Sequence, residues 1–336
     1  MEANKVIIIA EAGVNHNGDI DLARHMITEA RKAGADYVKF QTAVPELVIS
    51  SIAPKAEYQK ETTGAEESQL DMCRKIHLPL SAYSELAGQC RREGIGFMST
   101  PFDLVSIDTL APLGMDYWKI PSGEITNLPY LRKIASKGGR VILSTGMSRL
   151  DEVETAVGVL EQGGISRDNI ILLHCTTQYP TPMEAVNLRA MDTLDTLGCA
   201  AVGYSDHTRG IEVPVAAVAR GARVIEKHFT LDKTMEGPDH KASLEPDELA
   251  AMVSAIRNIE QALGSPDKRV AEAEAPNIEV ARKSIVAARD IKAGELLTEE
   301  NLSVKRPGNG LSPMLWDKVI GTRAISDFRA DELIRL

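Results

Sequence analysis

The chain has 336 residues, of which 43% are hydrophobic and 26% are charged. This length can bury a large core and favours more than one domain. The 38 basic and 48 acidic residues give a formal net charge of -10, which argues against a general nucleic-acid-binding protein because such proteins carry basic surfaces.

No segment has the length and composition of a membrane span or of a secretion signal. The first apolar run, residues 6–10, is too short for the core of a signal peptide and is followed at once by Glu11. The four cysteines have no CxxC spacing and form no dense framework, which suits a reducing compartment. We therefore expect a cytoplasmic protein that has no membrane partner.

Eight short apolar runs typical of β-strands recur along the first three quarters of the chain, with helical segments between them. The runs are residues 6–10, 37–40, 96–99, 117–120, 141–143, 170–173, 200–202 and 224–225. Amphipathic stretches at 21–32, 152–160 and 211–219 have helical spacing. Eight such alternations predict an α/β fold of the (β/α)8 TIM-barrel type. A doubly wound open sheet is the alternative, but no glycine-rich phosphate turn follows an early strand.

The segment between the second strand and its helix, residues 42–76, is long and rich in polar residues, and it contains Pro45, Pro54 and Gly64. Long loops in compact domains are usually functional or disordered. At the mouth of a barrel, we expect this segment to act as a substrate lid.

The chain changes character after a predicted helix at residues 246–263. Residues 265–280 are polar, contain Pro266 and Pro276, and are predicted to be a linker. Residues 281–336 contain short strand-like pieces and a loose repeat, IKAGELL and FRADELI. We predict a barrel domain over 1–264, a linker over 265–280 and a small β-rich domain over 281–336.

Two histidines follow the last two predicted strands of the barrel, His207 after residues 200–202 and His228 after residues 224–225. Parallel neighbours in a sheet lie about 5 Å apart, so both imidazoles could bind one divalent metal. Either histidine alone is more often an ordinary hydrogen-bonded residue. Their polar neighbours favour a functional site; these are Ser205, Asp206, Glu226, Lys227 and Asp239.

Polar residues end all eight predicted strands, at the face where TIM barrels build their active sites. They are Glu11, Lys39, Gln41, Thr100, Lys119, Ser122, Glu124, Ser144, His174, Ser205, His207, Glu226 and His228. A single lysine or serine here could be a salt-bridged packing residue or a helix cap. Together, two lysines and three hydroxyls could bind a phosphate or a carboxylate; these are Lys39, Lys119, Ser122, Ser144 and Ser205. An anion beside a metal indicates metal-assisted carbon–carbon bond chemistry or phosphoryl chemistry.

Nine segments, in this order along the chain, resemble the bacterial sialic acid synthase family. They are AEAGVNHNGD, VKFQT, STPFD, WKIPSGE, ILSTGM, LLHCTTQYPTP, GYSDHT, IEKHFTLDKTMEGPDH and KRPGNGLSP. The resemblance spans nearly the whole chain. Its last part is similar to the type III antifreeze-like domain, also called the SAF domain, which has a β-clip fold.

The resemblance implies an enzyme, a transferase that condenses phosphoenolpyruvate with N-acetylmannosamine and releases phosphate, and that requires Mn²⁺ or Mg²⁺. His207 and His228 would bind the metal. Glu11 and Glu226 would be the catalytic carboxylates. Five residues would hold phosphoenolpyruvate: Lys39, Lys119, Ser122, Ser144 and Ser205. Gln41, Tyr179 and Asp239 would contact the sugar, and Arg306 would reach the sugar of the other protomer in a domain-swapped homodimer.

The identity of the acceptor sugar stays open. Some members carry an asparagine in the run after HC, where this chain has Thr176 and Thr177, and another in the lid, where this chain has ETTG at residues 61–64. An enzyme that makes N,N'-diacetyllegionaminate from a 2,4-diacetamido-2,4,6-trideoxymannose would share every phosphoenolpyruvate and metal residue. A metal-dependent aldolase, or a non-enzymatic ice- or sugar-binding protein, are alternatives of other classes.

Overall fold

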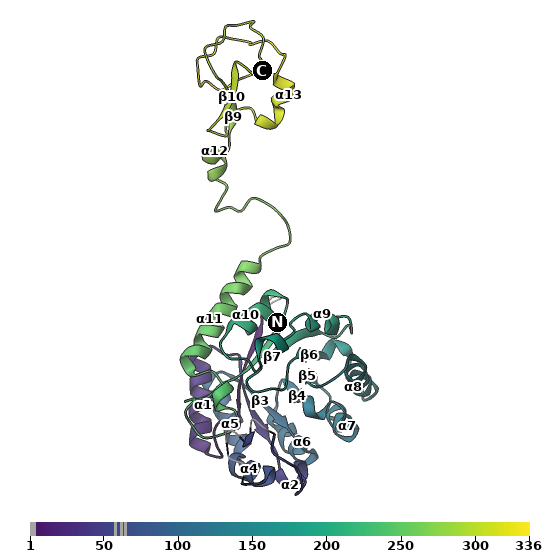
Figure 1. The fold of residues 1–336 in the computed structure, drawn as a ribbon. Helices are drawn as coiled ribbons and strands as arrows, with labels where there is room; N and C mark the ends of the chain where they lie inside the picture. The colour runs from purple at the N-terminus through teal and green to yellow at the C-terminus, as the bar shows by residue number, and fades with distance from the viewer. Residues whose placement is uncertain (1–4, 57–58, 61–62, 64–65) are drawn as a thin grey trace. The chain divides into compact units, whose positions relative to one another are not determined.

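The computed structural model describes residues 5–56, 59–60, 63 and 66–336, and it divides into two compact units, residues 1–264 and residues 265–336. Within the first unit, eight parallel strands form one sheet in the order β3-β2-β1-β8-β7-β6-β5-β4. The end strands β3 and β4 also contact each other, which closes the sheet into a barrel (Figure 1). The predicted TIM barrel is confirmed.

The strands are β1 (Ile7–Gly13), β2 (Tyr37–Thr42), β3 (Gly96–Pro101), β4 (Tyr117–Ile120), β5 (Arg140–Ser144), β6 (Ile170–His174), β7 (Ala201–Asp206) and β8 (Val224–His228). Most of them extend beyond the predicted apolar runs at their carboxyl ends. Residues such as Glu11 and His228 were expected after the strands, but they pair within them. The apolar runs end where the polar residues of the site begin. The backbone pairing between neighbouring strands nevertheless continues past this point.

Helices follow the strands around the outside of the barrel. They are α1 (Ile20–Lys32), α2 (Pro45–Val48), α4 (Gln69–Ile76), α5 (Ala82–Glu93), α6 (Leu104–Leu110), α7 (Leu128–Lys137), α8 (Leu150–Gln162), α9 (Ala190–Asp195), α10 (Glu212–Ala219) and α11 (Pro246–Leu263). Short 3-10 turns lie at 111–113, 122–124, 167–169, 183–185 and 240–242. The predicted helices at 21–32, 152–160, 211–219 and 246–263 are confirmed. No helix in the described part of the chain is long and apolar enough to cross a membrane.

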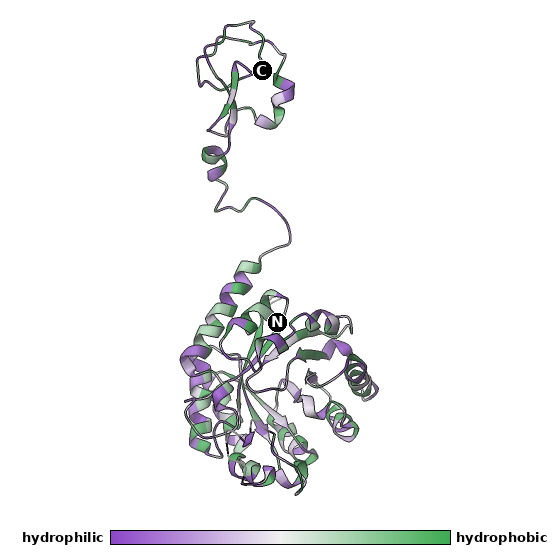
Figure 2. Cartoon of the chain, in the orientation of Figure 1, coloured by the Kyte–Doolittle hydropathy of each residue, from purple (hydrophilic) through white to green (hydrophobic). Residues whose placement is uncertain are grey.

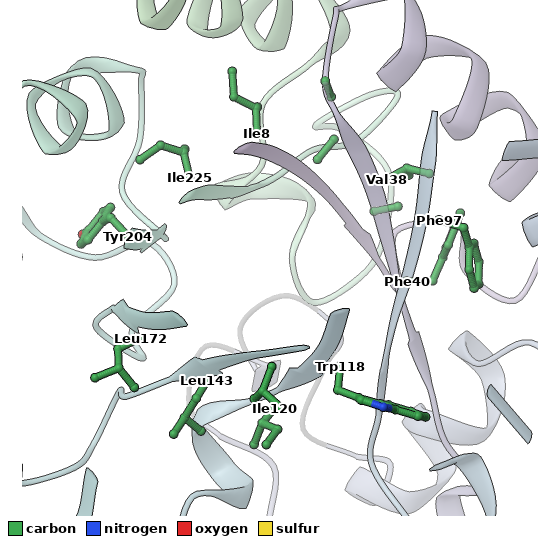
Figure 3. Packing of buried hydrophobic residues seen from close by; sticks show 14 of the residues in the cluster. Ile8, Val38, Phe40, Phe97, Trp118, Ile120, Leu143, Leu172, Tyr204 and Ile225 are labelled. Carbon is green, nitrogen blue, oxygen red and sulfur yellow. The ribbon is translucent and has the colours of Figure 1, made fainter. Parts of the chain in front are cut away.

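The larger core lies between the outward faces of the strands and the helices. Figure 3 shows labelled members of this layer, including Ile8, Val38 and Tyr204. The helices carry both hydrophilic and hydrophobic residues (Figure 2), as expected when one side of a helix covers a sheet. In α1, for example, the buried residues Ala23, Met26, Ile27 and Ala30 recur at helical spacing.

A second, smaller cluster fills the inside of the barrel. It includes Ile9, Met98, Tyr117, Ile142 and Val224. Because side chains on a strand alternate between its two faces, the residue two positions later points to the same side. Ile9 is thus followed by Glu11, Tyr117 by Lys119, and Val224 by Glu226. The barrel interior therefore has an apolar layer below a polar layer.

The second unit contains an antiparallel pair, β9 (Ser284–Ala287) and β10 (Leu302–Lys305), with helices α12 (Asn277–Ala281) and α13 (Trp316–Val319) and a 3-10 turn at 313–315. Its own core includes Ile285, Leu297, Val319, Phe328 and Ile334. The predicted repeat is visible in the backbone. Ile291 and Phe328, the first residues of the two copies, exchange both backbone hydrogen bonds at 2.8 Å. Gly294 and Asp331, the fourth residues, both have positive φ, 83° and 69°.

The long segment at residues 42–76, expected to be a loop that acts as a substrate lid, is partly helical, and its role as a lid stays a prediction. It contains α2 and α4, and the amphipathic sequence of α4 buries Met72. Part of the ETTG stretch, Glu61, Thr62 and Gly64, lies outside the described residues.

Candidate active site at the barrel mouth

One pocket at the carboxyl ends of the strands brings together twelve of the thirteen predicted site residues. They are Glu11, Lys39, Gln41, Lys119, Ser122, Ser144, Tyr179, Ser205, His207, Glu226, His228 and Asp239. Arg306 belongs to the second unit, where its Nε donates to the carbonyl oxygen of Ala281. Two other polar residues that were predicted at strand ends, Glu124 and His174, do not line this pocket.

The base of the pocket is a charged cluster that water barely reaches. Lys39 Nζ lies 2.7 Å from Glu11 Oε2 and 3.6 Å from Glu226 Oε2, and it donates to Thr100 Oγ1 at 3.0 Å. Lys119 Nζ lies 3.6 Å from Glu226 Oε1. Buried charges are stable only when they are paired, and here two ammonium groups balance two carboxylates.

Three serines surround this cluster. Ser144 Oγ accepts a hydrogen bond from Lys119 Nζ at 2.7 Å, and Ser205 Oγ donates to Glu226 Oε1 at 3.0 Å. Ser122 Oγ accepts from the backbone N–H of Gly146 at 2.9 Å. An added Cβ on Gly146 would lie 2.9 Å from Ser122 Oγ. The pocket therefore requires a glycine at this position to keep Ser122 in place.

The two buried glutamates have opposite pKa shifts. Burial raises the pKa of Glu11, and the carboxylate of Glu226 adds to this effect, although Lys39 opposes it. Burial also acts to raise the pKa of Glu226, but the ammonium groups of Lys119 and Lys39 outweigh it and lower that pKa. Neighbouring carboxyls with separated pKa values can hold and release a proton as a pair.

His207 and His228 lie side by side, with ring centroids 5.5 Å apart. His207 Nδ1 donates to the carbonyl oxygen of Thr176 at 2.6 Å, so its Nε2 keeps a free lone pair. His228 Nδ1 is buried without a hydrogen-bond partner and lies 3.9 Å from Asp239 Oδ2. Burial lowers the pKa of both imidazoles, which favours the neutral form that binds metals.

The described residues contain no group of three or more histidine, cysteine, aspartate or glutamate side chains arranged to hold a metal. His207 and His228 nevertheless suit a divalent ion that keeps open coordination positions, because neutral imidazoles bind such ions. The Nδ1 of His228 is also buried without a hydrogen-bond partner. The residues present fit such an ion as two protein ligands.

The outer part of the pocket contains apolar residues that the sequence reasoning missed, because it considered only polar groups. They include Val14, Met72, Ile76, Phe102 and Met147. The helical spacing of Met72 and Ile76 in α4 was the available signal. Tyr179 stacks near His207, with ring centroids 4.1 Å apart.

Comparison with known proteins gives a consistent result over the whole chain. The NeuB family model matches residues 26–268, and the SAF domain model matches residues 282–336. The chain is 54% identical to the N,N'-diacetyllegionaminic acid synthase of Campylobacter jejuni, over 98% of this chain and 99% of that protein. It is 45% identical to the protein of the same name from Legionella pneumophila, over 94% and 89%.

Among solved structures, the N-acetylneuraminic acid synthetase of Leptospira borgpetersenii superposes with a TM-score of 0.71 at 36% identity. The match covers 82% of this chain and 91% of that one. The predicted SAF domain is thus confirmed by its family model, together with the barrel.

Proposed function

Because this chain belongs to the NeuB family, whose members are phosphoenolpyruvate-dependent nonulosonic acid synthases, we propose that it makes N,N'-diacetyllegionaminate. Its substrates would be phosphoenolpyruvate and 2,4-diacetamido-2,4,6-trideoxymannose. The observation that carries the proposal is the 54% identity to a relative of that name over nearly the full length of both chains. N-acetylmannosamine, the first expectation from the sequence, becomes the second candidate.

The apolar outer part of the pocket supports this choice of acceptor. The diacetamido sugar has a C6 methyl and two acetamido methyls, whereas N-acetylmannosamine has one methyl group and a C6 hydroxyl. Met72, Ile76 and Phe102 offer apolar surface to such methyl groups. A buried methyl contributes about 0.8 kcal/mol, so two extra methyls amount to roughly a tenfold preference or more.

At the base of the pocket, Lys39 and Lys119 would bind the phosphate and carboxylate of phosphoenolpyruvate, with hydroxyls from Ser122, Ser144 and Ser205. The two lysines pair with Glu11 and Glu226. An arriving anion would share the lysines, and the pKa values of both carboxyls would rise from those of the lysine-paired state. Proton uptake by Glu11 would then accompany substrate binding.

His207 and His228 would hold a divalent ion, Mn²⁺ or Mg²⁺. When bound, the ion would polarise the carbonyl of the open-chain sugar. Asp239, Gln41 and Tyr179 would orient the sugar so that its C1 faces C3 of phosphoenolpyruvate.

The reaction forms one carbon–carbon bond, and at C2 it forms a carbon–oxygen bond to water and breaks the one to phosphate. C3 of the enol attacks C1 of the sugar, water adds at C2, and the tetrahedral intermediate expels phosphate. Glu11, whose pKa is raised, is suited to give a proton to the new C4 oxygen. Glu226, which stays ionised beside two lysines, is suited to accept a proton from the attacking water.

We further propose that the protein works as a domain-swapped homodimer in which Arg306 reaches the sugar in its partner's barrel. Several exposed large apolar residues lie on the loops and first helical turns at the barrel mouth, among them Leu47, Ile52, Leu104, Met147 and Met183. An apolar rim of this kind is suited to a protein contact. The expected cytoplasmic location stays a prediction.

Phosphate release from purified protein, phosphoenolpyruvate and Mn²⁺ with each sugar in turn tests the proposal. We expect kcat/KM for the diacetamido sugar to exceed that for N-acetylmannosamine at least tenfold. The reverse order would assign the protein to sialic acid synthesis, and release with neither sugar would contradict both readings. Lys119→Met should abolish release, whereas Lys133→Met, a change in a partly exposed lysine on α7, should leave it unchanged.

A further inference from the structure

A fully buried ion pair joins the ends of β7 and β8 directly behind the proposed metal ligands. The side chains of Lys227 and Asp206 have no exposed surface. Lys227 Nζ donates to Asp206 Oδ2 and to the carbonyl oxygen of Thr208, each at 2.5 Å. Asp206 also accepts hydrogen bonds from the backbone N–H of Thr208 at 3.1 Å and from its hydroxyl at 3.0 Å. Every charge in this cluster is therefore satisfied.

The pair alternates with site residues along both strands. Asp206 lies between Ser205 and His207, and Lys227 lies between Glu226 and His228. Asp206 and Lys227 are also register partners across the β7–β8 ladder. Because successive side chains on a strand point to opposite faces, the ion pair lies on the side away from the pocket. The hydrogen bonds given above join Asp206, Lys227 and Thr208, and none of these three residues lines the pocket.

His207 itself lies just beyond the last residue of β7 and no longer has a sheet partner. Three tethers hold it. Its Nδ1 bonds to Thr176 O, its own carbonyl oxygen accepts from the N–H of Thr181 at 2.8 Å, and the next residue, Thr208, is bound by Asp206 and Lys227. Of these three tethers, the third is the one that reaches β8, the strand that carries His228.

A buried ion pair is an inefficient way to stabilise a fold, because desolvation offsets most of the Coulomb attraction. Apolar side chains in these positions could stabilise the barrel as well. What they could not supply is a directional link from β8 to the backbone of the His207 turn. Mutation of a residue that orients a metal ligand in this way, without binding the metal itself, typically lowers metal affinity by about 10–100-fold.

We propose that Asp206 and Lys227 are positioning residues, which set the spacing of His207 relative to His228 and thereby the affinity for the divalent ion. This inference rests on the proposed metal site. It assigns no chemical step to either residue. Their effect would reach the reaction only through the geometry of the two imidazoles.

The test compares Mn²⁺ binding with stability in the full-length protein. Lys227→Met removes the ammonium group but keeps the length of the side chain. Free Mn²⁺, measured by electron paramagnetic resonance, gives the Kd, and urea unfolding gives the stability. We expect the Kd to rise 10–100-fold, and the visible absorption bands of the Co²⁺-loaded protein to change, because the ligand geometry changes.

Two further variants separate positioning from general destabilisation. The double variant Asp206→Asn/Lys227→Met removes the carboxylate that Lys227→Met leaves unpaired; we expect it to recover stability but not Mn²⁺ affinity. Arg257→Met is the control, because Arg257 pairs with Asp36 at 2.7 Å near the amino-terminal ends of the strands. It should lower stability and leave the Kd for Mn²⁺ within twofold.

Two results would overturn the inference while the metal site stands. One is a Kd for Lys227→Met equal to that of the wild type. The other is recovery of both affinity and stability in the double variant, which would assign the loss of affinity to weakened folding. If the wild type leaves all Mn²⁺ free, the proposed metal site fails, and the positioning role fails with it.

Discussion

Replacement of a single buried histidine should remove part of the acid sensitivity of the barrel. His16 lies in the loop between β1 and α1 and is fully buried. Burial, with a further contribution from His77, lowers its pKa to about 4 from the ordinary value of 6.5. Its Nδ1 accepts a hydrogen bond from the backbone N–H of Gly18 at 3.1 Å, and a proton added there would face another donor.

The sign of the effect follows from proton linkage. In the unfolded chain, His16 takes up a proton as the pH falls below about 6.5. In the folded protein, it takes up this proton only as the pH falls to about 4. The free energy of unfolding therefore falls with decreasing pH in this window. With these two pKa values, the loss is about 2 kcal/mol at pH 5 and about 3 kcal/mol at pH 4.

The assay compares the wild type with His16→Gln, in which the glutamine oxygen can still accept from Gly18. Both carry Trp316→Phe, so that fluorescence reports on Trp118 in the barrel alone. We expect the stability of the wild type, relative to His16→Gln, to fall by about 2 kcal/mol between pH 7 and pH 5. His25→Gln is the control, because the side chain of His25 is 59% exposed.

A difference between wild type and His16→Gln that stays constant within about 0.5 kcal/mol over this range would refute the reasoning. It would mean that His16 takes up its proton equally in the folded and unfolded states. An equal pH-dependent change in the His25→Gln control would also contradict it, since the effect would then not depend on burial.

Three other predictions follow from local geometry. Gly146→Ala should raise the KM for phosphoenolpyruvate at least fivefold without unfolding the protein, because the new methyl would displace Ser122; steady-state kinetics and circular dichroism check this, and an unchanged KM would contradict it. A fragment that ends at Gly264 should fold but lose most of its turnover, since it lacks Arg306, and full activity would remove that residue from the site. Gly294→Ala, at a φ of 83°, should destabilise the second unit by about 1–2 kcal/mol, as measured by Trp316 fluorescence; no loss would show that the turn tolerates a side chain.

Much of the barrel was predictable because its strands are buried on both faces and appear as short apolar runs. The carboxyl ends of the strands were not, since Glu11 and Glu226 interrupt the apolar pattern while the backbone still pairs. A pattern of hydrophobicity cannot separate a polar residue that ends a strand from one that points into a polar site. The hydrogen-bond register decides this.

The candidate site could be anticipated as a set of residues but not as a network. The sequence predicts that Lys39, Lys119 and Glu226 meet at one barrel end, since parallel strands bring their carboxyl ends together. It does not predict which carboxylate each lysine contacts, or that the pKa of Glu11 is raised. The apolar wall from α4 was missed because α4 lies in a segment that the sequence analysis assigned to a polar loop.

The pocket is built from strands at its base and from loops and α4 at its outer part, which has a consequence for how the family can acquire new acceptor sugars. The residues proposed for phosphoenolpyruvate lie mostly on strands, where an insertion of one residue would turn every following side chain to the other face. The apolar wall proposed for the sugar comes largely from loops and from α4, which can change length without disturbing the sheet. With these proposed roles, changes of length are tolerated best around the acceptor, so that a chain of this design could exchange one sugar for another and keep its donor site.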